Sequence, residues 1–374
     1  MGVIRILLAL SVLVGHMGGI FGFQLAPPPT AVELFFIISG FYMALILTEK
    51  YNSYSLFITN RFLKIYPAYL FVLLVTIACS FVYFLKTHSY DAGMVGKVLS
   101  AKEKLSPGAL GFLMLPNLII FGQDILFFLK TDAHYHIAFA TNFADSPVVL
   151  VRLLAIPQAW SISLELMFYL IAPFLVKLST KVLGILIALG IGLKIALYAN
   201  GLNFDPWTYR FFPAELLFFL LGIVSYRFYK SPLFVRLQTR LDGRSSNIYY
   251  GFVLAVLFFY SYLVSNWALF ALSIGFFTFS LPFIFSKFKK NRLDKKIGDF
   301  SYELYICHEL VVYVLMATLA KVSHHENLNK LIIVITSLIA AYTVSMLITQ
   351  KIDRFRQARL ERTKARRLQT AAAS

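Results

Sequence analysis

Charged residues are scarce in this chain. Asp, Glu, Lys and Arg make up only 14% of its 374 residues, whereas soluble domains contain about 25%. Hydrophobic residues make up 59%, and the mean hydropathy is +0.73. Several apolar windows reach the length needed to cross a hydrocarbon core of about 30 Å. The composition therefore excludes a water-soluble globular fold and indicates a membrane protein with several spans.

Cysteine is almost absent as well. Cys79 and Cys307 both lie inside apolar segments, which excludes a disulfide framework and a cysteine-based metal site. A lone cysteine in such a segment usually acts as a small hydrophobic residue. The first apolar segment also lacks a convincing small-residue cleavage site, so we expect a retained helix and not a removed signal peptide.

Acidic residues are outnumbered two to one, by 35 Lys and Arg to 18 Asp and Glu, for a net charge of +17. Nucleic acid is a common partner of such a basic chain. Here, however, the basic residues crowd into short connections between apolar segments, as the positive-inside rule describes. We therefore expect a lipid bilayer and no nucleic acid as partner, with both termini in the cytoplasm.

The apolar segments predict an all-α integral membrane protein with about ten transmembrane helices. We expect one transmembrane domain over 1–350, with an outer region at 87–159, and a basic cytoplasmic tail over 351–374. Segment 107–130 is apolar but broken by Pro and Gly, and a full crossing would turn the later basic loops outward. We expect it to be re-entrant or interfacial. The predicted spans are 3–23, 31–49, 67–86, 160–177, 182–199, 211–229, 247–264, 267–286, 298–320 and 331–350.

Ionisable residues inside the spans are costly, and each is therefore a candidate site residue. Arg5 and His16 are eleven residues apart, which places them on one helix face about 16 Å apart. A lipid-snorkelling anchor is an alternative role for Arg5, and a buried imidazole bonded to a neighbouring helix is one for His16. The candidates are Arg5, His16, Glu33, Glu165, Lys194, Arg210, Glu215, Glu303, His308 and Glu309.

Six segments, in order and over nearly the whole chain, resemble the motifs of the acyltransferase 3 family of integral membrane O-acyltransferases. Two departures are Lys64, where the family has a second arginine, and Leu166, where it has a second acid. The segments are "RILLALSVLVGH" (5–16), "VELFFIISGFYMALIL" (32–47), "NRFLKIYPAYL" (60–70), "QAWSISLELMFYLIAPFL" (158–175), "YRFFPAELLFFLLGI" (209–223) and "GDFSYELYICHELVV" (298–312).

The resemblance implies an enzyme that takes an acyl group, usually acetyl, from cytosolic acyl-CoA and passes it to a hydroxyl. His16 suits the general base, since the pKa of histidine lies near neutrality, and Glu165 is a catalytic candidate beside it. A transient acyl-histidine is a second route. The expected donor-binding residues are Arg5, Arg61, Lys64, Tyr302, Tyr305 and His308. The expected acceptor-binding or site-lining residues are Glu33, Trp160, Ser161, Ser163, Arg210, Glu215 and Ser301.

The resemblance implies acyl-CoA as a co-substrate and no permanently bound cofactor. No metal is expected either, because His134, His136, His324 and His325 lie in outer loops without a ligand framework. Lys194 has no role in the resemblance, and we expect it to snorkel outward.

The leading hypothesis is an inner-membrane enzyme of bacterial type that acylates a cell-surface or exported glycan or glycolipid. A second copy of the chain, in a homo-oligomer, is a further candidate partner. The alternative is a transporter of an anionic or lipid-linked substrate. A transporter predicts inverted repeats and paired broken helices, and the sequence has neither. An assembly factor without catalysis gives no reason for Arg5 and His16 to share a helix face.

Overall fold

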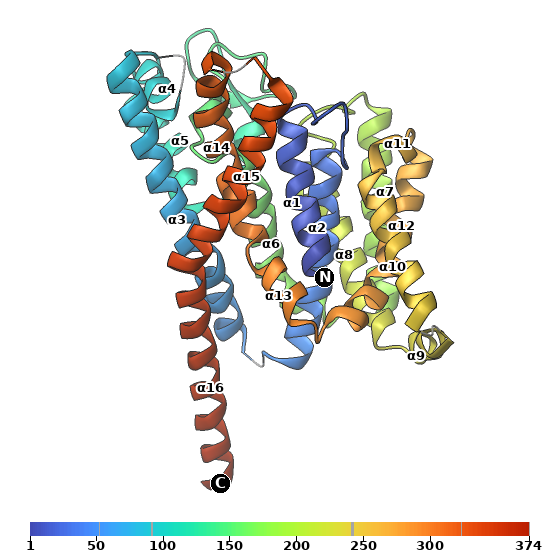
Figure 1. Cartoon of the computed structure of the whole chain (residues 1–374). Coiled ribbons are helices and arrows are strands. Elements are labelled where there is room, and N and C mark those ends of the chain that lie inside the picture. Colours follow the sequence, from blue (N-terminus) through green and yellow to red (C-terminus); the bar gives the residue numbers. More distant parts are fainter. Residues whose placement is uncertain (52, 91–92, 241–242, 323, 374) are drawn as a thin grey trace.

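The computed structural model describes residues 1–51, 53–90, 93–240, 243–322 and 324–373, and it confirms the predicted all-α fold (Figure 1). In these residues the only strands form one antiparallel hairpin, β1 (Leu129–Thr131) with β2 (Ile137–Phe139). Residues 91–92 of the predicted outer region and residue 374 of the predicted tail lie outside the described residues.

The chain folds into a bundle of helices. The α-helices are α1 (Gly2–His16), α2 (Pro28–Glu49), α3 (Tyr54–Thr87), α4 (Gly93–Lys102), α5 (Pro107–Ile119), α6 (Trp160–Leu175), α7 (Thr180–Ala199), α8 (Phe212–Tyr229), α9 (Pro232–Arg240), α10 (Gly243–Phe258), α11 (Tyr260–Leu263), α12 (Trp267–Phe288), α13 (Arg292–Asp299), α14 (Ser301–Val322), α15 (Glu326–Val344) and α16 (Gln350–Ala373). Short 3₁₀ turns are η1 (Ile125–Phe128), η2 (Leu150–Leu153) and η3 (Pro157–Ala159), and η4 (Ser345–Thr349) is a π-helical turn.

Seven helices in the described ranges are long and apolar enough to cross a membrane, so the chain is a multi-pass membrane protein. They include α2, α3, α7, α8 and α12, together with a helix formed by η3 and α6 and one formed by α15, η4 and the start of α16. The prediction of about ten spans stays a prediction.

The first helix is shorter than predicted. It ends at His16 and not near residue 23, because Gly18 and Gly19 have φ angles of +72° and +91°. This left-handed backbone suits glycine and cannot continue a right-handed helix. The early end leaves the His16 side chain 39% exposed at the last position of α1.

Glycine permits a close contact between α2 and α8. A Cβ on Gly40 of α2 would lie 2.0 Å from the carbonyl oxygen of Phe219 in α8, and a Cβ on Gly222 of α8 would lie 2.1 Å from that of Ile37. Only glycine permits this backbone approach, which is the way membrane helices pack. The two helices thereby form one wall behind the site.

The start of α1 is anchored by α13. The Asp294 carboxylate accepts hydrogen bonds from the backbone N–H groups of Gly2 at 2.8 Å and Val3 at 3.1 Å. Burial raises the pKa of Asp294, but these bonds to its ionised form hold the net pKa below its usual value. Asp294 therefore caps α1 from another helix and fixes the position from which Arg5 projects.

Different helices lie at the two ends of the bundle (Figure 1). One end carries α9, α13 and the tail helix α16, whereas α4 and α5 lie at the opposite end. The first is called the basic end here, because its helices contain the sequences "PLFVRLQTR", "RLDKKIGD" and "QKIDRFRQARLERTKARR". Helix α5 has 13 residues, about 20 Å, which is too short to cross the hydrocarbon core. Its end is tied to α3, since the Tyr69 hydroxyl donates to the Asn117 carbonyl oxygen at 2.7 Å.

Candidate active site

A cavity of about 530 Å³ opens among the helices near the basic end. It is lined by the first residues of α1, by residues 61–65 of α3, by α2 and α6, by the end of α12, by α13 and by the first two turns of α14. Its size falls within the range of about 300–1,000 Å³ typical of ligand sites. Five predicted donor-binding residues line it, namely Arg5, Arg61, Lys64, Tyr302 and Tyr305.

The cations of this cavity differ in their partners. Lys64 pairs with Asp353 of α16 at 3.0 Å, and this pair connects the cavity rim to the tail helix. Arg5 has no ion pair among the described residues, and Arg61 has a buried Nε without a hydrogen-bond partner there. Two guanidinium groups are thus available to phosphate oxygens, which arginine binds through charge-assisted hydrogen bonds.

Glu165 lies on the cavity wall and not in contact with His16. Its carboxylate accepts hydrogen bonds from Ser39 at 2.6 Å and from Tyr169 at 2.5 Å. Ser161, one turn earlier on α6, also lines the cavity, as the predicted shared face requires. Ser301 lines it too, while its hydroxyl donates to the Gly298 carbonyl oxygen.

Tyr305 closes the deep end of the cavity. Its hydroxyl lies 2.6 Å from the Ser161 Oγ and donates to the Gln158 carbonyl oxygen at 3.0 Å. The ring of Tyr305 also lies close to the ring of His308, with centroids 5.8 Å apart. Tyr305 therefore stands between the cavity and the imidazole of His308, which does not line the cavity.

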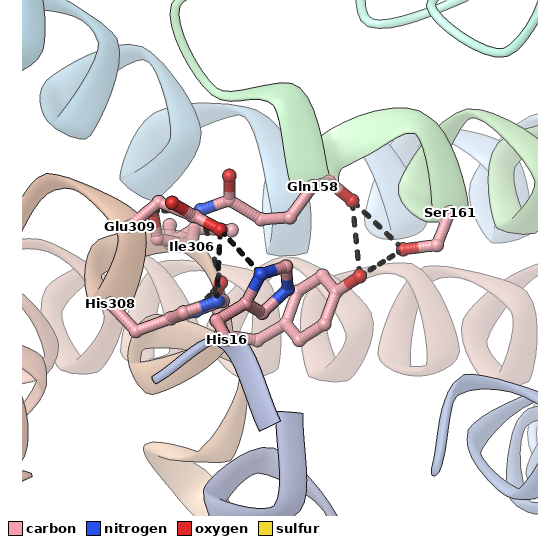
Figure 2. A network of polar contacts seen from close by, with 7 residues as sticks. His16, Gln158, Ser161, Ile306, His308 and Glu309 are labelled. Atoms are coloured by element: carbon pink, nitrogen blue, oxygen red, sulfur yellow. Dashed lines mark hydrogen bonds and ion pairs between the residues drawn. The ribbon is translucent and has the colours of Figure 1, made fainter. Parts of the chain in front are cut away.

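Beyond Tyr305 lies the histidine cluster, which we define as His16, His308 and Glu309 (Figure 2). His16 Nδ1 is 3.0 Å from Glu309 Oε1, and the two imidazole rings have centroids 5.3 Å apart. His308 Nδ1 lies 2.7 Å from the Tyr305 carbonyl oxygen. Because a carbonyl only accepts, Nδ1 of His308 carries the proton and its Nε2 carries a lone pair.

A second charged group, which we define as the lysine cluster, comprises Lys194, Glu33 and Glu215. Lys194 Nζ is 2.7 Å from Glu215 Oε1, 3.4 Å from Glu33 Oε1 and 3.0 Å from the Thr208 carbonyl oxygen. The three N–H donors of the ammonium group thus have three acceptors. The expectation that Lys194 snorkels outward is wrong, because two buried carboxylates hold it inside the bundle.

A comparison with protein families identifies the chain over most of its length. A family model described as an acyltransferase domain, Acyl_transf_3, matches residues 1–350. The chain belongs to the acyltransferase 3 family. Comparisons with curated proteins and with solved structures gave no match. The protein is therefore a membrane acyltransferase, and the transporter alternative is not favoured.

The predicted residues Trp160, Ser163 and Arg210 of this acyltransferase have structural partners. Arg210 pairs with Asp205 at 2.6 Å and stacks between Phe127 and Trp160, with its guanidinium carbon 3.9 Å and 4.4 Å from the ring centroids. Ser163 donates to Asp124 at 2.6 Å and accepts from the Gly122 N–H group. These contacts fasten the connection before α6 and the start of α8 to the bundle.

Two residues that contact the central groups of this acyltransferase site had no predicted role. Glu309 is one of the ionisable residues inside the predicted spans, yet its contact with His16, 293 positions away, exists only in the fold. Gln158 precedes α6, and its side-chain amide donates to the carbonyl oxygens of Tyr305 at 3.3 Å and Ile306 at 3.0 Å. The signal that the sequence offers for Glu309 is an ionisable side chain inside a predicted span.

Proposed function

We propose that this acyltransferase takes a short acyl group from acyl-CoA at the basic end and transfers it to a hydroxyl of a glycan or glycolipid at the opposite end. The observation that carries the proposal is the position of Tyr305, which lines the cavity and lies with its ring against that of His308. The basic end faces the cytoplasm by the positive-inside rule. The enzyme then belongs in an inner membrane of bacterial type.

The donor fits the cavity by its chemistry. Acyl-CoA combines phosphate groups with an extended thioester arm, and the cavity combines Arg5, Arg61 and Lys64 with apolar walls from α2 and α12. Phosphates bound at these cations leave the arm to reach toward Ser161 and Tyr305. The acyl group then lies against Tyr305, the boundary residue next to the histidine cluster, and the acceptor hydroxyl meets the thioester there.

His16 is the general base in this proposal. With Nδ1–H donating to Glu309, the Nε2 atom of His16 keeps the lone pair that accepts the proton of the acceptor hydroxyl. The hydroxyl oxygen attacks the thioester carbonyl carbon, the C–S bond breaks, and the CoA thiolate leaves and takes up the proton from the imidazolium. Glu309 stabilises the imidazolium while it exists, so the orienting carboxylate is Glu309 and Glu165 serves the donor cavity instead.

The test uses membrane vesicles of both orientations and labelled acetyl-CoA. We expect inside-out vesicles with the wild-type chain to label a glycan or lipid that is enclosed in the vesicle, and right-side-out vesicles to give no label. His16→Ala should abolish the label, whereas His134→Ala, a matched exposed histidine of the outer hairpin, should retain it. Absence of label in both orientations, or equal label with His16→Ala, would overturn the proposal.

A further inference from the structure

Three atoms that can act as metal ligands converge in the histidine cluster from two helices. One ligand atom from each of His16, His308 and Glu309 lies within 4.8 Å of the other two. Figure 2 shows His16 on one helix, facing His308 and Glu309 on another. His308 and Glu309 are adjacent in the sequence, and His16 reaches them because α1 ends there. Sequence reasoning predicted no metal site, since these residues meet only in the folded chain.

One atom of the cluster has no partner in the described structure. The side chain of His308 is fully buried, its Nδ1–H donates to the Tyr305 carbonyl oxygen, and its Nε2 is without a hydrogen-bond partner there. This lone pair lies 4.0 Å from Glu309 Oε1, which is itself an acceptor. Two acceptors that face each other in a buried place repel, and a cation between them removes the repulsion.

We propose that the histidine cluster is a zinc-binding site with His308 Nε2, Glu309 Oε1 and His16 Nδ1 as its three protein ligands. Two imidazoles and one carboxylate with an open fourth position are a ligand set that Zn²⁺ favours, at about 2.0–2.2 Å from each atom. The hydrogen bond from His308 Nδ1 to a backbone carbonyl is the support that holds metal-binding histidines in place. Mg²⁺ and Ca²⁺ prefer oxygen ligands and bind poorly here.

The site is accessible and able to close on an ion. His16 is 39% exposed and the Glu309 side chain 28% exposed, so an ion reaches them without unfolding of the bundle. A rotamer change of Glu309 shortens the separation of 4.0 Å between its Oε1 and His308 Nε2, and a rotamer change of His16 adjusts the position of its Nδ1 in the same way.

Zinc at this site turns off the proposed base, a consequence that rests on the proposed function. Zn²⁺ binds Nδ1 of His16 in place of the proton shared with Glu309. The neutral imidazole then carries its proton on Nε2, which has no lone pair left for the acceptor hydroxyl. We therefore infer that zinc at the opposite end of the bundle inhibits acyl transfer by competing for the same imidazole.

The test measures zinc binding to the full chain, without a histidine tag, in lipid nanodiscs by competition with a chromophoric chelator. We expect one Zn²⁺ per chain, and an affinity lowered at least tenfold in both His16→Ala and His308→Ala. The control is the double variant His134→Ala/His136→Ala, which removes the exposed histidine pair near Asp132 and should bind as the wild type does. If His308→Ala fails to fold, the exposed helix-end variant His16→Ala still decides.

Equal zinc affinity in the wild type and both cluster variants would overturn the proposal, and so would loss of binding in the control variant. Mg²⁺ in place of Zn²⁺ should give no competition. Acylation in vesicles is measured in parallel with zinc added on the side of the opposite end. Zinc that binds through the cluster without inhibiting acylation would leave the metal site standing and overturn His16 as the base, so the two failures are distinguishable.

Discussion

The lysine cluster and the histidine cluster both hold carboxylates inside the bundle, but they differ in how these carboxylates are paired. Each brings carboxylate and basic groups together inside a membrane bundle, where unpaired charge is expensive. The lysine cluster contains its own cation, whose three donors are all used. The histidine cluster places a fully buried imidazole nitrogen and a carboxylate oxygen 4.0 Å apart, and that nitrogen has no hydrogen-bond partner among the described residues.

This difference separates a structural cluster from a reactive one. Glu215 is fully buried, and Lys194 holds α7, α8 and α2 together through its two carboxylates. The histidine cluster is open on the side of His16, and its unsatisfied lone pair is the feature expected of a group that binds a proton, a hydroxyl or an ion in turn. Substitutions in the two clusters should therefore affect different quantities.

The largest effect should come from His16→Ala, which tests whether the histidine cluster acts in acyl transfer and not in stability. We expect acyl transfer to fall about 100- to 10,000-fold, the contribution of a general base. The free energy of unfolding should change by less than about 1 kcal/mol, because His16 is the exposed last residue of α1. Transfer rates with membrane levels matched, together with unfolding in detergent, measure both. A transfer rate above one tenth of wild type would contradict the assignment.

Lys194→Met should show the reverse pattern. Removal of the ammonium leaves two buried carboxylates facing each other, and loss of one partner of a buried ion pair costs about 3–5 kcal/mol. Thermal unfolding in detergent measures the loss, while the transfer rate per folded molecule should remain near wild type. Lys181→Met, an exposed lysine near the start of the same helix, is the matched control and should unfold as wild type. Equal stability of the two variants would remove the structural role of the lysine cluster.

Sequence reasoning predicted the fold class and most of the helix positions, since apolar length is a local property of the chain. It placed Arg5, Arg61, Lys64, Tyr302 and Tyr305 in one donor site, and all five line one cavity. Their grouping followed from the family resemblance, together with a predicted depth near the cytoplasmic side for Arg5, Arg61 and Lys64. His308, the sixth predicted donor-binding residue, does not line the cavity. Their role toward acyl-CoA stays a prediction.

Pairings across long sequence distances were not predictable. Glu309 and not Glu165 contacts His16, because packing of α1 against α14 decides which carboxylate it meets. Lys194 turns inward for the same reason, since only the fold brings Glu33 and Glu215 to one place. The end of α1 at His16 depended on two left-handed glycines, whose φ angles the sequence does not reveal.

Glu309→Gln should have a smaller effect than His16→Ala and tests which carboxylate orients the base. The amide oxygen still accepts from His16 Nδ1, but it lacks the charge that stabilises an imidazolium. Charged hydrogen bonds are about 1 kcal/mol stronger than neutral ones, so we expect the transfer rate to fall roughly 5- to 10-fold. Glu326→Gln, an exposed acid at the start of α15, is the control. A greater loss of maximal rate with Glu165→Gln than with Glu309→Gln would return the orienting role to Glu165.

Tyr305→Phe should have the smallest effect and tests whether the histidine cluster is kept apart from the cavity. The variant retains the ring beside His308 but loses the hydroxyl that bonds Ser161 and Gln158. Loss of such a bond is worth about 1 kcal/mol, so water should cross the barrier more often and acceptor-independent hydrolysis of acyl-CoA should rise about fivefold. Tyr302→Phe is a matched control on the same helix, because its hydroxyl donates to the Ile65 carbonyl oxygen away from the barrier. Release of free CoA without acceptor measures the leak. An equal rise in both variants would mean that Tyr305 is one wall residue among others, and the boundary between cavity and histidine cluster would have to lie elsewhere.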